Sequence, residues 1–138
     1  MSQMAKNKVE GLDIKKLSLS TVKKALEQME KAELGEIVTE IHGGMRGGTF
    51  KVKGIGFLPV GDSYGVDIYM EGKVLQMYGD DMSHYKDADS PFRKEFKKAY
   101  TAVAIAEQFG ADGFNTKISH KFAGKERMVE YLVSAEAF

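Results

Sequence analysis

The sequence predicts an α+β fold, a two-layer sandwich in which two helices cover one face of a largely antiparallel sheet. Three observations predict it. Residues 20–34 and 90–110 have the apolar periodicity of amphipathic helices. Strand-like alternation fills the chain between these helices and returns after the second one, and glycine-containing turns join successive strands. The expected order is therefore α-β-β-β-β-α-β-β, without an internal repeat or a linker.

The N-terminal part leads into the first helix. Residues 1–11 are polar and are expected to form a flexible tail, with residues 12–138 forming a single domain. Residues 12–19 carry apolar side chains whose alternation slips, so a short irregular strand and a turn both fit them. The first helix has Ser20 as its expected N-cap and Gly35 as the residue that ends it. Its apolar face consists of Val22, Ala25, Leu26, Met29 and Ala32.

Two strands are expected directly after the first helix. Residues 36–42 and 49–57 alternate in the manner of strands. The segment between them, 43–48, reads GGMRGG and either turns a hairpin or stays mobile, because so many glycines do not form regular structure. The parity of the apolar residues in the second strand changes at Gly54, which predicts a β-bulge or a bend.

A second hairpin is expected after a turn at 59–63. The sequence Glu71-Gly72 reads as its two-residue turn, before a strand at 73–80. The polar residues 81–89 then connect this strand to the second helix. One face of the first strand of this hairpin consists of Tyr64, Val66, Ile68 and Met70.

The helix at 90–110 is the clearest element of the chain. Ser90 is its expected N-cap, Pro91 its first helical residue and Gly110 its left-handed C′ residue. One face is apolar and consists of Phe92, Phe96, Ala99, Tyr100, Val103 and Ala106. The opposite face carries Arg93, Lys94, Lys97 and Lys98. Ile105 and Phe109 lie off the apolar stripe, which predicts either wider burial or contact with another subunit.

A C-terminal hairpin has the most regular strand pattern. Apolar and polar residues alternate from Phe114 to Phe122, the turn falls at 123–125, and the chain returns over 127–133. Val129, Tyr131 and Val133 are expected on one side of the returning strand.

The composition excludes several classes of function. The formal charge is zero, with 20 basic and 20 acidic residues, so the molecule as a whole has no field that attracts nucleic acid or a membrane. Without cysteine there is no disulfide, thiolate catalysis or cysteine-ligated metal. The chain has no long apolar run and no signal-like segment, so a cytoplasmic protein with no membrane partner is expected.

Several short motifs support a resemblance that spans roughly residues 20–133. The carriers are Gly61-Asp62-Ser63-Tyr64, Tyr100 with Val103, and Gly113-Phe114. With the order of the elements, they resemble the "hypothetical chloroplast reading frame" family of plastids and cyanobacteria, which has bacterial and phage relatives. The resemblance implies turn and packing residues and fits a bacterial or phage accessory protein. It implies no catalytic or ligand-binding residue, because none is established for that family.

Two acidic strings suggest metal chemistry, but neither has the surroundings that this chemistry needs. Tyr78-Gly79-Asp80-Asp81 matches the YGDD string of RNA-dependent RNA polymerases, whose palm, fingers and thumb do not fit in 138 residues. The loop that carries Asp80, Asp81, His84, Asp87 and Asp89 lacks the spacing of a calcium loop. A strand end followed by a solvated acidic loop is expected, with no metal and no cofactor.

The three histidines lie on different predicted elements. His42 and His120 would support acid–base catalysis only if a carboxylate faced either of them across the sheet. His84 belongs to the acidic loop. No histidine spacing indicates a metal site, and no serine or histidine context indicates a nucleophile, so no catalytic residue is assigned.

The candidate binding residues form two groups. Backbone N–H groups of the glycine-rich loop suit an anion, with Arg46 as a fixed charge. The basic helix face suits a phosphate backbone, with Tyr64, Tyr69 or Tyr78 as base-stacking platforms. A flexible hairpin loop and a solvated helix face remain the alternatives. The candidate residues are Gly44, Arg46, Gly47, Gly48, Lys94, Lys97 and Lys98.

Three functional hypotheses follow. The first is a non-enzymatic binding or interaction module that contacts a protein partner or a second copy of itself, through its sheet surface or the glycine-rich loop. Ile105 and Phe109 favour this hypothesis. The second is a nucleotide- or nucleic-acid-binding protein that uses Arg46 and the basic helix face. The third is a small enzyme with a histidine acid or base.

Overall fold

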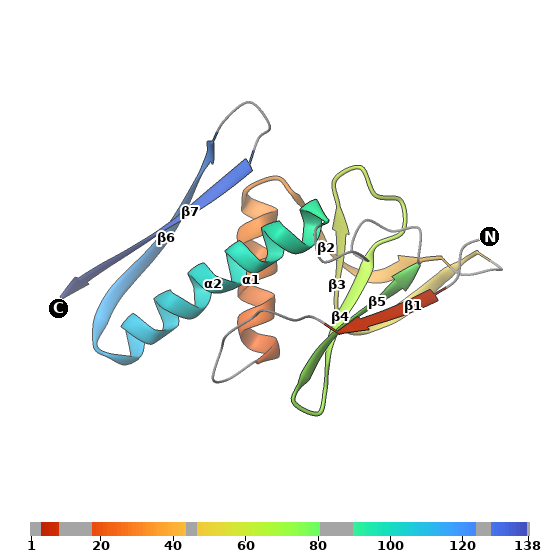
Figure 1. Ribbon diagram of the computed structural model, residues 1–138, viewed down its shortest axis with the longest axis horizontal. Helices are drawn as coiled ribbons and strands as arrows, with labels where there is room; N and C mark the ends of the chain where they lie inside the picture. The colour runs from red at the N-terminus through yellow and green to blue at the C-terminus, as the bar shows by residue number, and fades with distance from the viewer. Residues whose placement is uncertain (1–3, 9–17, 44–46, 81–89, 124–127, 138) are drawn as a thin grey trace.

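A computed structural model describes residues 4–8, 18–43, 47–80, 90–123 and 128–137 of the chain. The described part contains two helices and two antiparallel sheets, so the predicted α+β class is confirmed (Figure 1). The helices are α1 (Leu19–Lys31) and α2 (Pro91–Ala111). The strands are β1 (Met4–Lys8), β2 (Gly35–His42), β3 (Thr49–Pro59), β4 (Val66–Glu71), β5 (Val74–Asp80), β6 (Phe114–Ala123) and β7 (Met128–Ala137).

Strand β1 is absent from the predicted order, which is otherwise confirmed from α1 onward. It lies within the segment that the sequence predicts to be a flexible tail, yet it pairs antiparallel with β5. The larger sheet has the order β1-β5-β4-β3-β2, so β1 covers what would otherwise be the edge at β5. The ammonium of Lys6 also lies 3.1 Å from a carboxylate oxygen of Glu71 on β4. The open choice between a strand and a turn at 12–19 concerns mostly residues outside the described part.

Both helices begin at a serine that caps them. The Ser90 hydroxyl oxygen accepts the N–H of Arg93 at 3.2 Å, with Pro91 in the first turn, as predicted. The N-cap of α1 is Ser18 and not the predicted Ser20, and its hydroxyl oxygen accepts the N–H of Thr21 at 3.1 Å.

The end of α1 differs from the prediction because a glutamate takes the expected place of glycine. Glu33 has a left-handed backbone with φ of 60°. The N–H of Leu34 then donates to Met29 O at 3.0 Å, a bond typical of a Schellman motif. Gly35 instead starts β2, where a side chain would clash with Leu58 O. The glycine is needed for the close approach of β2 and β3, and not for the helix terminus.

The end of α2 and one of its faces also differ from the prediction. Gly110 lies inside the last turn, and Gly113, with φ of 91°, is the left-handed residue after the helix. The N–H of Gly113 donates to Gly110 O at 3.1 Å. Arg93 is buried, although the sequence predicts it on the solvent side with the three lysines.

The core lies between the helices and one face of the larger sheet. Phe57 of β3 stacks on Phe92 of α2 with ring centroids 5.7 Å apart, and the row of rings continues through Phe96 to Tyr100. The predicted apolar faces of both helices are confirmed, because their side chains are buried. The sheet contributes Val66, Ile68, Leu75 and Met77 to this cluster.

Strand β3 is irregular where the sequence predicts a bulge or bend. Its register with β2 shifts between Val38 and Glu40, opposite the stretch that contains Gly54. The N–H groups of Lys53 and Gly54 donate to the two carboxylate oxygens of Asp67 on β4, at 2.8 and 3.0 Å. A buried aspartate therefore satisfies the donors that the irregular strand leaves free.

The two hairpins after β3 are both present, and the turn of the first lies within the described residues. The turn between β4 and β5 is Gly72-Lys73, one residue later than predicted, since Glu71 pairs with Val74. Gly72 has φ of 62°, as a two-residue hairpin turn requires. The predicted C-terminal hairpin is confirmed, and it forms a separate sheet that packs on α2 (Figure 1).

Candidate protein-interaction surface

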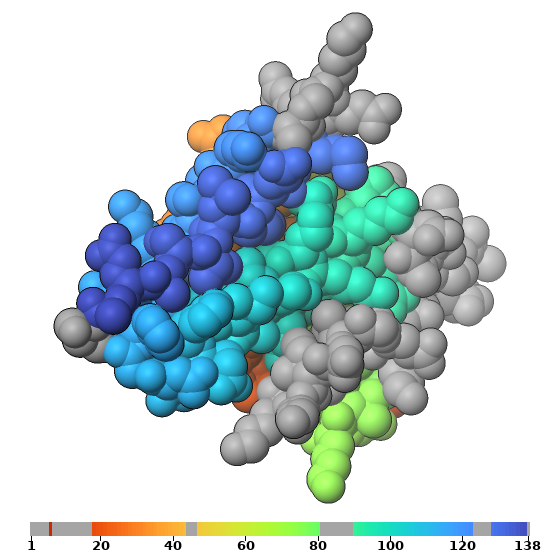
Figure 2. Space-filling model, turned by 60° about the vertical axis from the view of Figure 1, so that its left-hand side comes forward, coloured from red at the N-terminus to blue at the C-terminus, as the bar shows by residue number. Residues whose placement is uncertain are grey.

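The C-terminal hairpin lies on α2 with one of its two faces. Val129 is fully buried against the helix, and Ile118 and Tyr131 are half-buried beside it. Figure 2 shows β7 running beside α2 along the surface of the molecule. The side chains of opposite parity point to solvent, including Lys117, Lys121, Met128, Glu130 and Leu132.

A groove of about 500 Å³ runs between α2 and β7. Four consecutive β7 residues line it, and because neighbouring side chains in a strand point to opposite faces, the groove follows the edge of β7. Two large apolar side chains in this lining are solvent-exposed, Ile105 at 43% and Leu132 at 50%. The lining residues are Lys97, Lys98, Thr101, Ala102 and Ile105 from α2, and Glu130, Tyr131, Leu132 and Val133 from β7.

The edge of β7 that faces this groove has no strand beside it among the described residues. Proteins protect such edges with charged side chains, lysine above all. Strand β6 carries Lys117 and Lys121 on its solvent face, whereas the solvent face of β7 carries no lysine, and Leu132 lies between its charged residues Glu130 and Glu136. Residues 129–133, VEYLV, are also rich in residues that favour strands. The β7 edge is therefore well suited to pairing.

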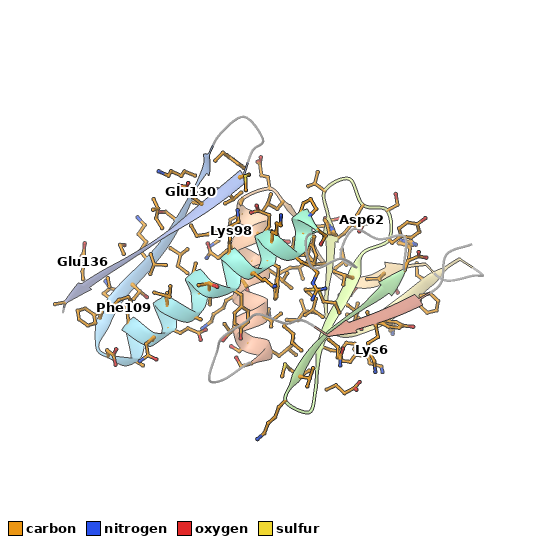
Figure 3. The ribbon with its side chains drawn as sticks, in the orientation of Figure 1. Lys6, Asp62, Lys98, Phe109, Glu130 and Glu136 are labelled. Carbon is orange, nitrogen blue, oxygen red and sulfur yellow. The ribbon has the colours of Figure 1, made fainter. Side chains whose placement is uncertain are left out.

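A polar contact, the Lys98 anchor, ties β7 to α2. The Lys98 ammonium lies 2.6 Å from a Glu95 carboxylate oxygen and donates to the backbone oxygen of Val129 at 2.7 Å. Figure 3 labels Lys98 on α2 close to Glu130 on β7. Burial, and then the nearby Glu95 charge, raise the pKa of Tyr131, so this hydroxyl stays neutral at physiological pH.

The predicted basic face of α2 is divided among different surroundings. Lys94 is exposed, Lys97 lines the groove and Lys98 belongs to the anchor, while Arg93 is buried. A phosphate backbone is held by several cations that face it together. Fewer cations than predicted are available for that purpose on this helix. Of the three proposed base-stacking tyrosines, Tyr69 is buried, with the Lys53 ammonium 5.3 Å from its ring centroid, and the other two are half-buried.

The glycine-rich loop is described only at its two ends. Gly44 and Arg46 lie outside the described residues, so their predicted anion-binding role stays a prediction. Gly47 and Gly48 are exposed and have positive φ angles of 66° and 96°. At the base of the loop, a side chain at Gly43 would sit 2.7 Å from the Asp80 carboxylate.

The residues considered for catalysis and metal binding do not converge in the described part of the chain. His42 is exposed at the end of β2, and His120 packs edge-on against Phe122 with centroids 6.2 Å apart. Neither side chain is hydrogen-bonded to a described carboxylate. Asp80 is fully buried at the end of β5, while Asp81 and the acidic loop with His84 lie outside the described residues. No group of three ligands suited to a metal is present among the described residues.

Comparison of the chain with protein-family models, with curated proteins and with solved structures gives no match. The resemblance to the chloroplast reading-frame family therefore stays a prediction. In the described part of the chain, neither helix is long and apolar enough to span a membrane.

One side of this surface was predictable from the sequence, and the other was not. Ile105 was identifiable because it lies off the apolar stripe of its helix; it is 43% exposed, so the predicted alternative of wider burial does not hold there, and contact with another subunit stays a prediction. Leu132 was not predicted because it lies at a solvent-facing position of β7. Its indication in the sequence is that it is apolar although its parity is opposite to that of Val129 and Tyr131. The role of Lys98 depends on a backbone oxygen 31 residues away, which no local pattern encodes.

Proposed function

We propose that this chain is a non-enzymatic protein-binding module whose contact surface is the α2–β7 groove. The observation that carries the proposal is an apolar groove beside an unpaired strand edge. An unpaired edge supplies backbone donors and acceptors, and the apolar lining supplies surface to bury.

The chemistry of the lining favours binding. Burial of Ile105 and Leu132 against a partner would stabilise the complex by roughly 25 cal/mol per Å² of apolar surface removed from water. The ammonium of Lys97 stands at the same groove and can select an acidic group on the partner. A polypeptide partner matches this surface, because an extended strand has backbone hydrogen-bonding groups along its edge and side chains on both faces.

Site-specific photo-crosslinking tests the proposal. A photoreactive amino acid replaces Leu132, and in a matched control it replaces Lys51, an exposed residue of β3. Each variant is expressed in the cells that encode the protein and irradiated, and the adducts are identified by mass spectrometry. Position 132 is expected to give defined protein adducts that position 51 does not give. Identical adducts from both positions, or none from position 132, would contradict the proposal.

A further inference from the structure

The free edge of β7 suits pairing with the same edge of a second copy of the chain. We propose that two copies associate by antiparallel pairing of β7 with β7, about a two-fold axis at Leu132. This inference rests on the proposed function. The two hairpins then form one continuous four-stranded sheet. An isologous contact of this kind uses the same surface patch on both copies and closes after two.

The backbone hydrogen-bonding groups of β7 alternate in the way that this pairing requires. Backbone groups in an antiparallel strand point alternately to one neighbour and to the other. The Val129 carbonyl meets Lys98 Nζ on the α2 side, and alternation directs the N–H and C=O groups of Tyr131 and Val133 to the same free edge. The Ser134 hydroxyl donates to Lys117 O at 3.4 Å across the hairpin, which agrees with this phase.

The side chains select the register with Leu132 on the axis. In this register Tyr131 of each copy exchanges backbone hydrogen bonds with Val133 of the partner subunit. The two Leu132 side chains meet as a non-hydrogen-bonded pair, the arrangement in which cross-strand side chains are closest. Glu130 then lies opposite Ser134 of the partner subunit, so no like charges face each other.

The neighbouring registers are less favourable. An axis at Val133 places Glu130 opposite Glu136 of the partner subunit, and like charges directly opposite are destabilising. An axis at Tyr131 places Leu132 opposite the charged Glu130 of the partner subunit, so the two leucine side chains do not meet. Of these three registers, only the one with Leu132 on the axis pairs two apolar solvent-facing side chains of the described residues.

Helix α2 extends the contact beneath the new sheet. In Figure 1, β7 and α2 run in a similar direction, so the two-fold axis brings α2 of the two copies alongside one another in opposite directions. The groove residues Thr101, Ala102 and Ile105 then face their counterparts. Small residues at two of these positions allow close approach, and Ile105 loses its exposure to solvent.

Sedimentation velocity of the purified protein over a wide concentration range tests the inference. The wild type is expected to show a reversible monomer–dimer equilibrium. Leu132→Lys places two ammonium groups on the axis and removes two apolar contacts, each worth on the order of tenfold, so dimerisation weakens by about a hundredfold. Val133→Pro removes an edge N–H and is expected to give a monomer. Ser119→Lys puts the same charge opposite Leu132 on β6, away from the pairing edge, and is expected to leave the dimer.

Circular dichroism shows whether each variant is folded. If Val133→Pro unfolds the hairpin, the test depends on Leu132→Lys, which changes an exposed side chain. A wild type that is monomeric at every concentration overturns the inference, as does a dimer that folded Leu132→Lys leaves unchanged. A monomer whose residue 132 still crosslinks to a different protein overturns the inference and leaves the proposed function standing.

Discussion

At the scale of single residues, Asp67 stabilises the irregular β3 strand. Only 2% of the residue is exposed, and its two oxygens accept the N–H groups of Lys53 and Gly54. Asp67→Ala leaves two donors without an acceptor and is expected to lower the free energy of unfolding by about 3 kcal/mol. Urea unfolding measures this loss. Asp112→Ala, at the exposed end of α2, is the control, and an equal loss in both variants would show that Asp67 has no special role.

Glu33 holds a backbone conformation that glycine adopts more readily. Glu33→Gly is expected to raise the free energy of unfolding by about 0.5–1 kcal/mol, because φ is 60° at that position. Gly35→Ala, two residues later, is expected to lower it, since the added methyl group clashes with Leu58 O. Thermal unfolding of both variants tests the assignment, and a stabilised Gly35→Ala protein would contradict it.

Tyr131 links stability to alkaline pH. Burial and Glu95 raise the pKa of its hydroxyl in the folded protein, so the stabilisation is complete below the ordinary tyrosine pKa of about 10. It is lost as the pH rises from there towards the folded pKa, because only the unfolded chain ionises in that range. Tyr131→Phe should lessen the alkaline loss by at most about 1.4 kcal/mol per pH unit. Urea unfolding between pH 8 and about pH 11 tests this, and equal slopes for both proteins would refute it.

At the scale of elements, the C-terminal hairpin depends on α2. Lys98→Met removes the bond to Val129 O and leaves the largely buried Glu95 without its cation, so the hairpin is expected to open more easily. Amide hydrogen exchange in β6 and β7 should quicken about tenfold, while exchange in the larger sheet stays unchanged. Lys94→Met, on the exposed side of the same helix, is the control. Equal exchange in the two variants would mean that apolar packing alone holds the hairpin.

The elements show which sequence signals were sufficient. The apolar face of α2 was predictable because helical periodicity and both N-terminal signals, Ser90 and Pro91, agree. The end of α1 was not, because Gly35 was needed for strand packing and Glu33 took the left-handed position against its own preference. Local patterns cannot distinguish these two uses of glycine.

At the scale of the whole molecule, the remaining misses depend on distant contacts. The sequence of β1, MAKNK, has no strand pattern, and it pairs because β5 offers an edge about 70 residues later in the chain. The α2–β7 groove is a second example. Helical periodicity predicts its α2 side, whereas the exposure of its β7 side depends on how the hairpin packs on α2. Class and element order follow from local patterns, whereas edges and grooves follow from assembly.

Removal of residues 1–8 tests the role of β1 in the whole fold. The truncated protein exposes the backbone groups of β5, so its free energy of unfolding should fall and new self-association should appear. Urea unfolding and sedimentation measure the two effects. Lys6→Ala removes only the exposed ion pair with Glu71 and should change little. A truncated protein as stable as the wild type would show that β1 is dispensable.

The Gly72-Lys73 turn has a practical consequence. It is exposed, a side chain at Gly72 would meet no other atom within 4 Å, and Figure 1 shows it at the end of the β4–β5 hairpin, away from β6 and β7. Because the chain has no cysteine, Lys73→Cys would create a single thiol there. A dye or a surface linkage at this site would report on binding or immobilise the protein without obstructing the α2–β7 groove.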